Sequence, residues 1–210
     1  MPEEINQQEK ARTDFLIAMY NQLMNDINRH IIVIWQSVGV LFGAFAVFAL
    51  VEKGTISFDF AATLVVVLCI WVIAHVYDAS YWYNRNLVII ANIERQFLRQ
   101  SDLREIHYYF GAHRRGDAMI THLELQRNLA IGIAILVLLI EFSNITLPIL
   151  RNEKCGSFQN LLPWLGALLL FVVWLWAREK SRRRIETFLQ NSPGKPMDTT
   201  GIEHGPGHPV

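Results

Sequence analysis

The stretch IIVIWQSVGVLFGAFAVFALV at residues 31–51 decides the fold, because it contains no charged side chain over its whole length. Three further apolar runs follow at residues 60–76, 129–150 and 161–177. A helix of about 20 apolar residues crosses a hydrocarbon core of about 30 Å and satisfies its own backbone hydrogen bonds there. None of the runs shows the period-two alternation of a strand. The sequence therefore predicts an all-α membrane protein with four transmembrane helices.

Composition agrees with a membrane protein, since 52% of the 210 residues are hydrophobic, more than an ordinary soluble domain of this size carries. The first thirty residues are too polar for a cleavable signal peptide, so we expect the first span itself to direct insertion. Cys69 falls within the second run and Cys155 between the third and fourth runs. At such different depths they are not expected to pair within one subunit.

Basic residues are distributed unevenly among the connections between the runs. The connections at residues 52–59 and 151–160 hold few of them, whereas the central connection holds Arg85, Arg95, Arg99, Arg104, Arg114, Arg115 and Arg127. A second cluster follows the fourth run and comprises Arg178, Lys180, Arg182, Arg183 and Arg184. The positive-inside rule therefore predicts that both termini and the central connection are cytoplasmic. We expect the second cluster to contact anionic lipid headgroups.

Helical periodicity continues from the first two runs into their cytoplasmic flanks. Apolar residues recur every fourth position at Phe15, Met19, Leu23 and Ile27, and no Gly or Pro separates them from residue 31. One continuous helix is the preferred interpretation, and an amphipathic helix lying flat on the lipid is the alternative. Residues 78–100 carry a similar stripe. The predicted organisation is a cytoplasmic amphipathic helix at 1–30, a transmembrane hairpin at 31–77, a cytoplasmic helical stalk at 78–128, a second hairpin at 129–177, and a basic segment with a disordered tail at 178–210.

Small residues form one face of the first span at Gly39, Gly43 and Ala46. Such residues allow helix backbones to approach closely in a membrane, where lipid gives no hydrophobic drive for association. The face therefore predicts either a contact between copies of the chain or packing within one four-helix bundle. We predict a homo-oligomer on the first of these two interpretations.

Polar side chains inside the spans are the candidates for a pore or polar cavity, and they are Glu141, Asn144 and Gln36. An ionisable group within a span usually faces a bundle interior or a water-filled path. Glu141 lies near the outer end of its run, where Lys53 and Arg151 are possible partners. The alternative is a tilted span that leaves Glu141 at the outer interface.

Motifs for catalysis are absent from the cytoplasmic segments, which contain no glycine-rich phosphate loop and no nucleophile elbow. His107, His113 and His122 lack the Cys or carboxylate partners of a known metal-binding spacing. Arg115 and His122 are separated as in HEPN-type ribonucleases, but a single pair is a weak signal. We therefore expect no enzymatic activity, no catalytic residues, no metal, no cofactor and no nucleic-acid partner.

In outline, the chain resembles small multi-span membrane proteins of bacterial anti-phage systems, including SLATT-type effectors. The resemblance rests on the stalk segments 78–100 and 117–128 and on the span that carries Gly39 and Gly43. It implies a bacterial inner-membrane protein that oligomerises and permeabilises the membrane in antiviral defence, and it assigns no functional residue. SLATT-type proteins usually have two spans, whereas four are expected here. The alternatives are a membrane scaffold that recruits a cytoplasmic protein to the stalk, and a small transporter.

Overall fold

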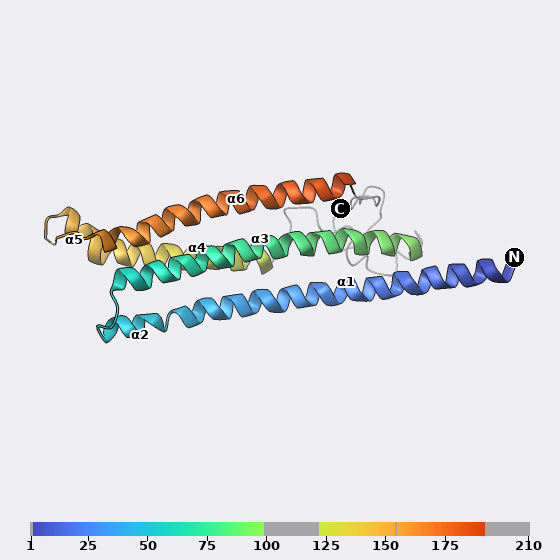
Figure 1. The fold of residues 1–210 in the computed structure, drawn as a ribbon, viewed down its shortest axis with the longest axis horizontal. Coiled ribbons are helices and arrows are strands. Elements are labelled where there is room, and N and C mark those ends of the chain that lie inside the picture. Colours follow the sequence, from blue (N-terminus) through green and yellow to red (C-terminus); the bar gives the residue numbers. More distant parts are fainter. Residues whose placement is uncertain (1, 99–121, 154, 192–210) are drawn as a thin grey trace, which may run out of the picture. The chain divides into compact units, whose positions relative to one another are not determined.

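The computed structural model describes residues 2–98, 122–153 and 155–191. Figure 1 shows the described residues almost entirely as helices. In chain order the elements are α1 (Pro2–Ala44), α2 (Val47–Glu52), α3 (Phe58–Phe97), α4 (His122–Glu141), the π-helix η3 (Phe142–Thr146), α5 (Leu147–Leu150), the 3-10 helix η4 (Phe158–Leu161) and α6 (Leu162–Asn191). Within the described residues there is no strand, so the all-α prediction is confirmed. Four helical segments are long and apolar enough to cross a membrane, at Ile5–Glu52, Phe58–Glu94, His122–Leu150 and Phe158–Asn191.

The helix α1 runs without interruption from the polar N-terminal segment into the first apolar run, as its sequence predicted. Its one proline, Pro2, stands at the first helical position, where the missing N–H costs no intrahelical bond. The helix α3 is similarly continuous over 40 residues and contains neither Gly nor Pro. Uninterrupted i→i−4 bonding in α3 follows from the absence of Gly and Pro, and in α1 from the absence of any proline after its first position.

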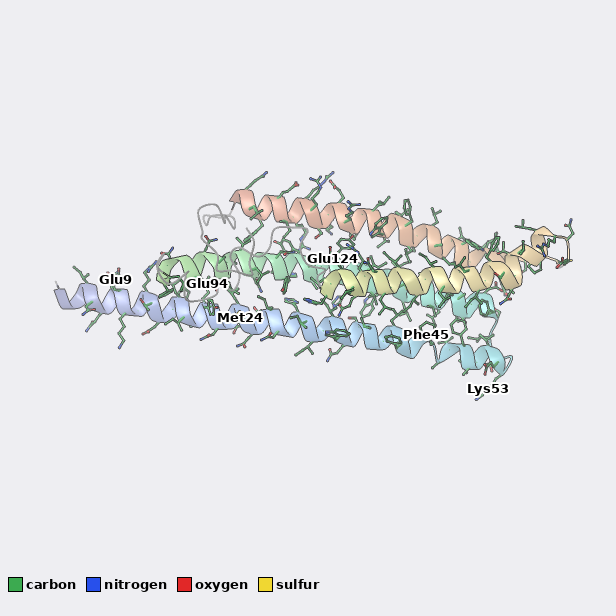
Figure 2. All side chains as sticks on the ribbon, turned by 180° about the vertical axis from the view of Figure 1, so that it is seen from behind. Glu9, Met24, Phe45, Lys53, Glu94 and Glu124 are labelled. Atoms are coloured by element: carbon green, nitrogen blue, oxygen red, sulfur yellow. The ribbon has the colours of Figure 1, made fainter. Side chains whose placement is uncertain are left out.

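An interruption at Phe45 and Ala46, which the sequence analysis did not predict, separates α1 from α2. The N–H groups of these residues bond to carbonyls three residues back, Phe45 to Phe42 at 3.1 Å and Ala46 to Gly43 at 3.0 Å. Figure 2 labels Phe45 at this position. Gly43 lies in the affected turn, and glycine is a weak helix former, so the tighter turn occurs where the helix is least supported.

The connection from α2 to α3 is a tight glycine turn. Gly54 has φ +68° and donates its N–H to Val51 O at 2.9 Å, while Thr55 N–H bonds to Leu50 O at 2.9 Å. These two bonds form a Schellman motif, in which glycine adopts the left-handed conformation without steric cost. Ser57 then caps α3, since its Oγ accepts the N–H of Phe60 at 3.2 Å. The first pair of apolar helices is thus joined by a short hairpin.

The chain divides into two compact units. Unit 1 comprises residues 1–31, 81–120 and 184–210, and unit 2 comprises residues 32–80 and 121–183. Among the described residues of unit 1, the core consists of Leu23 and Ile27 from α1 and Leu87, Ile90 and Ile93 from α3, and Met24, labelled in Figure 2, packs against it. The N-terminal part of α1 thus packs on the part of α3 that follows the second apolar run. A helix lying flat on lipid would leave these side chains in the membrane instead.

One residue of the N-terminal apolar stripe lies outside the core of unit 1. Phe15 is 67% exposed, whereas Met19 is half-buried and Leu23 and Ile27 are buried. It lies at the edge of the stripe, beyond the part of the α1 surface that contacts α3. Residues 99–121 of the predicted stalk and the predicted disordered tail after residue 191 lie outside the described residues.

In unit 2 the segment of α3 is the most buried helix, and its side chains Ala61, Ala62, Val65, Val66 and Cys69 are all fully buried. Three other elements contact it. The Cys69 thiol lies against the backbone of Ala134 in α4. Trp174 of α6 donates its indole N–H to the Tyr77 hydroxyl at 3.1 Å. Phe48 of α2 lies with its ring centroid 5.5 Å from that of Phe58. The core of unit 2 is therefore built around α3.

Candidate functional site

The predicted small-residue face of α1 packs against nothing in the described part of the chain. A Cβ atom built at Gly39 or Gly43 meets no atom within 4 Å, and Ala46 is exposed. Packing within the bundle of one chain therefore does not use this face. Small residues gain nothing from lipid contact, so their exposure leaves room for another helix.

Gln36 lies on the same face. At 3.6 residues per turn, positions 36, 39 and 43 of α1 fall within an arc of about 60°. The Gln36 side chain is exposed, and it forms no hydrogen bond within the described residues. An amide in an apolar span is satisfied by hydrogen bonding across a helix contact. The face thus combines space for a close approach with a polar group that lacks a partner in its own chain.

Glu141, at the end of α4, lies inside unit 2 with no exposed surface. Thr146 Oγ1 lies 3.2 Å from Glu141 Oε1 and 3.0 Å from Oε2. The Thr146 hydroxyl in turn accepts the indole N–H of Trp164 at 3.0 Å. Glu141 therefore contacts groups of its own chain at the junction of α4, η3 and α6.

The π-helix η3 explains how Thr146 reaches Glu141. Residues five apart in an α-helix point about 140° away from each other, whereas π-helical i→i+5 bonding brings them close to one face. Pro148 gives a reason for the wider turn, since it lacks an N–H and its ring crowds the carbonyl four residues back. Proline inside a helix usually bends or ends it. The chain instead widens into η3 and continues as α5 to Leu150.

The other predicted cavity residues do not join Glu141. Asn144 is exposed on η3, and Gln36 is exposed on α1. Lys53, labelled in Figure 2 at the end of α2, and Arg151 are exposed and form no ion pair with Glu141 among the described residues. The expected salt-bridge partners of this carboxylate are thus not beside it.

Asp59 was missed by the sequence analysis and is the second buried carboxylate of unit 2. It stands in the first turn of α3 with 6% of its surface exposed. Its Oδ2 accepts the side-chain N–H of Asn160 at 3.1 Å, while its Oδ1 is buried without a hydrogen-bond partner. An acidic residue after a Ser cap is usual at a helix start, so neither residue type nor position indicated that Asp59 is buried.

The basic cluster of α6 retains exposed charges. Arg182 and Arg183 bond to Glu179 at 2.8 and 2.6 Å, and their hydrogen bonds lower the pKa of Glu179 to about 2. Both arginines nevertheless have more than half of their side-chain surface exposed. Lys180 lies 4.4 Å from the ring centroid of Trp176, and Arg178 is exposed. Exposed pairs of this kind contribute little stability, so the cluster remains available to an anionic surface.

Arg184, the last residue of the predicted cluster, is assigned to unit 1. Its guanidinium carbon lies 3.9 Å from the ring centroid of Tyr81. Arg85 similarly lies 5.2 Å from the ring centroid of Trp82. Such cation–aromatic contacts are typical of the level where a helix leaves the lipid.

Unit 1 contains one buried acid, Glu94, well beyond the apolar run that ends at Val76. The Tyr20 hydroxyl donates to Glu94 Oε1 at 3.3 Å. Burial raises the pKa of Glu94, and the hydrogen bond from Tyr20 offsets only part of that increase. Figure 2 labels Glu94 on α3.

Features that could support other chemistry are few in the described ranges. Within them, no three His, Cys, Asp or Glu side chains lie close enough to hold a metal ion. The His75 ring stacks on Trp71 with centroids 5.5 Å apart. A pocket of about 420 Å³ is lined by Ile56, Ser57, Phe60, Gln159 and Leu162, and neither buried carboxylate lines it.

Comparison of the chain with known protein families, curated protein sequences and solved structures gives no match. The function is therefore argued from the chain's own geometry. Two features stand out, the exposed face at Gln36, Gly39 and Gly43 and the buried carboxylates of Asp59 and Glu141.

Proposed function

We propose that this protein is a multi-pass protein of the bacterial inner membrane that associates with copies of itself through the exposed face of α1 and permeabilises the membrane. The observation that carries the proposal is the open space at Gly39 and Gly43, where no atom lies within 4 Å of an added Cβ. The unpartnered amide of Gln36 supports it.

Self-association is favoured because the exposed face of α1 combines small residues, Gly39 and Gly43, with the polar amide of Gln36. Small residues let two helix backbones approach closely, which increases van der Waals contact where lipid supplies no hydrophobic drive. The same approach allows the Gln36 amides of neighbouring chains to bond to each other or to a backbone carbonyl. Large apolar residues elsewhere on the spans, such as Trp35 and Phe42, are exposed and are satisfied by lipid alone.

Permeabilisation extends the proposal from assembly to activity. A polar amide that repeats around an oligomer gives water and ions a path that a single apolar helix does not. The outline of the chain, with apolar hairpins continued by helical segments, agrees with anti-phage effectors that act in this way. Antiviral defence as the biological role rests on that resemblance.

A scaffold without a pore is the second candidate, and one observation favours it. Ile5, Phe15 and Ile17 on the polar part of α1 are 62%, 67% and 49% exposed. These apolar side chains lie outside the first apolar run, so lipid does not account for their exposure. A soluble protein partner that binds this helix would cover them.

The test compares the wild type with the double variant Gly39→Ile and Gly43→Ile. The matched control is Gly132→Ile on α4, where an added Cβ also meets no atom within 4 Å. Oligomer size is measured by cross-linking and by single-molecule photobleaching in lipid. Permeability is measured by dye entry into cells and by ion flux in liposomes, with equal protein amounts.

We expect the double variant to lose both the oligomer and the permeability, and Gly132→Ile to keep both. An oligomer that survives the double substitution would refute the assignment of this face. Wild-type protein that assembles but admits neither dye nor ions would refute the pore and support the scaffold.

A further inference from the structure

Two arginines meet aromatic rings where α3 and α6 contact each other in unit 1. The guanidinium carbon of Arg184 on α6 lies 3.9 Å from the ring centroid of Tyr81 on α3. The guanidinium carbon of Arg85 on α3 lies 5.2 Å from the ring of Trp82 and 5.9 Å from the ring of Phe188 on α6. All five residues belong to the same compact unit. Each helix thus contributes one arginine to a shared contact.

The two guanidinium groups lie on adjoining turns of this contact. Tyr81 and Arg85 are four residues apart on α3, and Arg184 and Phe188 are four residues apart on α6, so each pair shares one helix face. The ring centroids of Tyr81 and Trp82 are 5.4 Å apart. The two cross-helix contacts are therefore separated by about 6 Å along the helix axes. One ligand of moderate size can contact both arginines.

The contacts with the rings leave hydrogen-bond donors for such a ligand. A guanidinium has five N–H donors, and the face of an aromatic ring offers no oxygen or nitrogen acceptor. Arg85 forms no hydrogen bond and no ion pair in the part of the chain that the structure describes. Both arginines are half-buried, so the rings restrict their side chains. Arg182 and Arg183 differ, because they bond to Glu179 and are more than half exposed.

The direction of the two side chains is toward the apolar runs. Arg85 follows Val76, the last residue of the second run, by nine residues, and Arg184 follows Ala177, the last residue of the fourth run, by seven. Helical side chains lean toward the N-terminus of their helix, which in α3 and α6 is the direction of the apolar run. The contact of Arg85 with Trp82, three residues earlier, follows this lean. A headgroup layer of about 5–8 Å next to the hydrocarbon core is within the reach of such side chains.

We propose that Arg85 and Arg184 form a binding site for the phosphate group of an anionic phospholipid. The planar fork of a guanidinium matches two phosphate oxygens, and two such forks favour a headgroup with net negative charge over a zwitterionic one. The site differs from the predicted basic cluster, because Arg85 lies on another helix and outside that cluster. The proposal rests on the membrane insertion in the proposed function, and it depends neither on self-association nor on permeabilisation.

The test is native mass spectrometry of the full-length protein in detergent, titrated with phosphatidylglycerol or with zwitterionic phosphatidylethanolamine. We expect the wild type to bind phosphatidylglycerol with the lower Kd. Arg85→Gln and Arg184→Gln should each raise that Kd about 10–100-fold, because each removes charge-assisted hydrogen bonds to the phosphate. Arg85→Lys keeps the charge without the planar fork and should recover part of the affinity. The control Arg183→Gln removes one exposed charge from α6 and should raise the Kd less than about 5-fold.

Three results would each overturn the proposal. They are equal Kd values of the wild type for the two lipids, an equal change of Kd in folded Arg85→Gln and Arg183→Gln, and binding of water-soluble glycerol 3-phosphate as tightly as phosphatidylglycerol. The first and third need only the wild type, so they apply even if a variant does not fold.

Lipid binding and assembly are measured separately. The double variant Gly39→Ile and Gly43→Ile should bind phosphatidylglycerol as tightly as the wild type does, because neither glycine lies in unit 1. A wild type that binds this lipid but neither assembles nor admits ions would contradict the proposed function and support the lipid site.

Discussion

The contact between α3 and α6 offers a quantitative test of the packing in unit 2. A Cβ atom added at Gly166 lies 3.2 Å from Val66 Cγ1 and 3.7 Å from Val66 Cβ. Unstrained carbon contacts are about 3.5–4.0 Å, so even one added methyl requires a shift. Val66 is fully buried and has little freedom to move. We therefore expect Gly166→Val to destabilise the protein through overpacking.

The matched control is Gly132→Val, because an added Cβ at Gly132 meets no atom within 4 Å. Both glycines lie within helices, so the change in helix propensity is nearly equal and cancels in the comparison. The remaining difference is the overpacking cost, about 1–3 kcal/mol. In a chain of this length that corresponds to a Tm about 2–12 °C lower for Gly166→Val than for Gly132→Val.

The assay is thermal unfolding in detergent, followed by circular dichroism. A double variant, Gly166→Val with Val66→Ala, removes the methyl groups that clash and should recover part of the loss, with a coupling energy of about 0.5–3 kcal/mol. Equal Tm values for Gly166→Val and Gly132→Val, with no coupling to Val66, would show that α6 does not pack on α3 at this position.

Three further predictions concern unit 1 and the basic cluster. Burial raises the pKa of Glu94 above its usual 4.5, so the folded state loses stability as the pH increases and Glu94 ionises. Glu94→Gln should therefore raise the Tm at pH 7. Below pH 4.5, where Glu94 is protonated, the variant and the wild type should have similar Tm values. Ile90→Ala truncates a fully buried core residue and should lower the free energy of unfolding, measured with a chemical denaturant, by about 2–5 kcal/mol. Ile17→Ala, at a half-exposed position, should change that free energy by less than about 0.5 kcal/mol. Replacing the five basic residues after the fourth apolar run with Gln should abolish the preference of the protein for anionic over neutral lipids. Native mass spectrometry of bound lipids measures this preference. An unchanged preference would show that other residues recognise the lipid.

Much of the fold could be predicted from the sequence because it depends on local properties. The four apolar runs, the uninterrupted α1 and the stripe with Leu23 and Ile27 each follow from residue type and helical spacing along one element. These features need no knowledge of which helix packs on which. The exposure of Phe15 differs because it depends on how far the contact with α3 extends around α1.

The candidate site was harder to predict because burial arises from packing between elements. Glu141 was recognised as unusual from its place in an apolar run. Its contact with Thr146 depends on a π-helix that residue spacing did not indicate. Asp59 stands at the edge of a run and resembles an ordinary helix-start acid, yet α3 and Asn160 enclose it. The exposed face at Gly39 could be identified from sequence, but only the structure distinguishes an open face from an internal contact.

The native thiols allow the proposed membrane topology to be measured most directly. Cys155 is exposed and Cys69 is buried. In cells whose outer membrane has been permeabilised, a membrane-impermeant maleimide should label the wild type, and Cys155→Ser should abolish that labelling. In the Cys155→Ser background, Gln190→Cys at the exposed end of α6 should react only after the inner membrane is disrupted. Labelling of Gln190→Cys while the inner membrane is intact, or protection of Cys155 from the maleimide, would contradict a four-span protein with both termini in the cytoplasm.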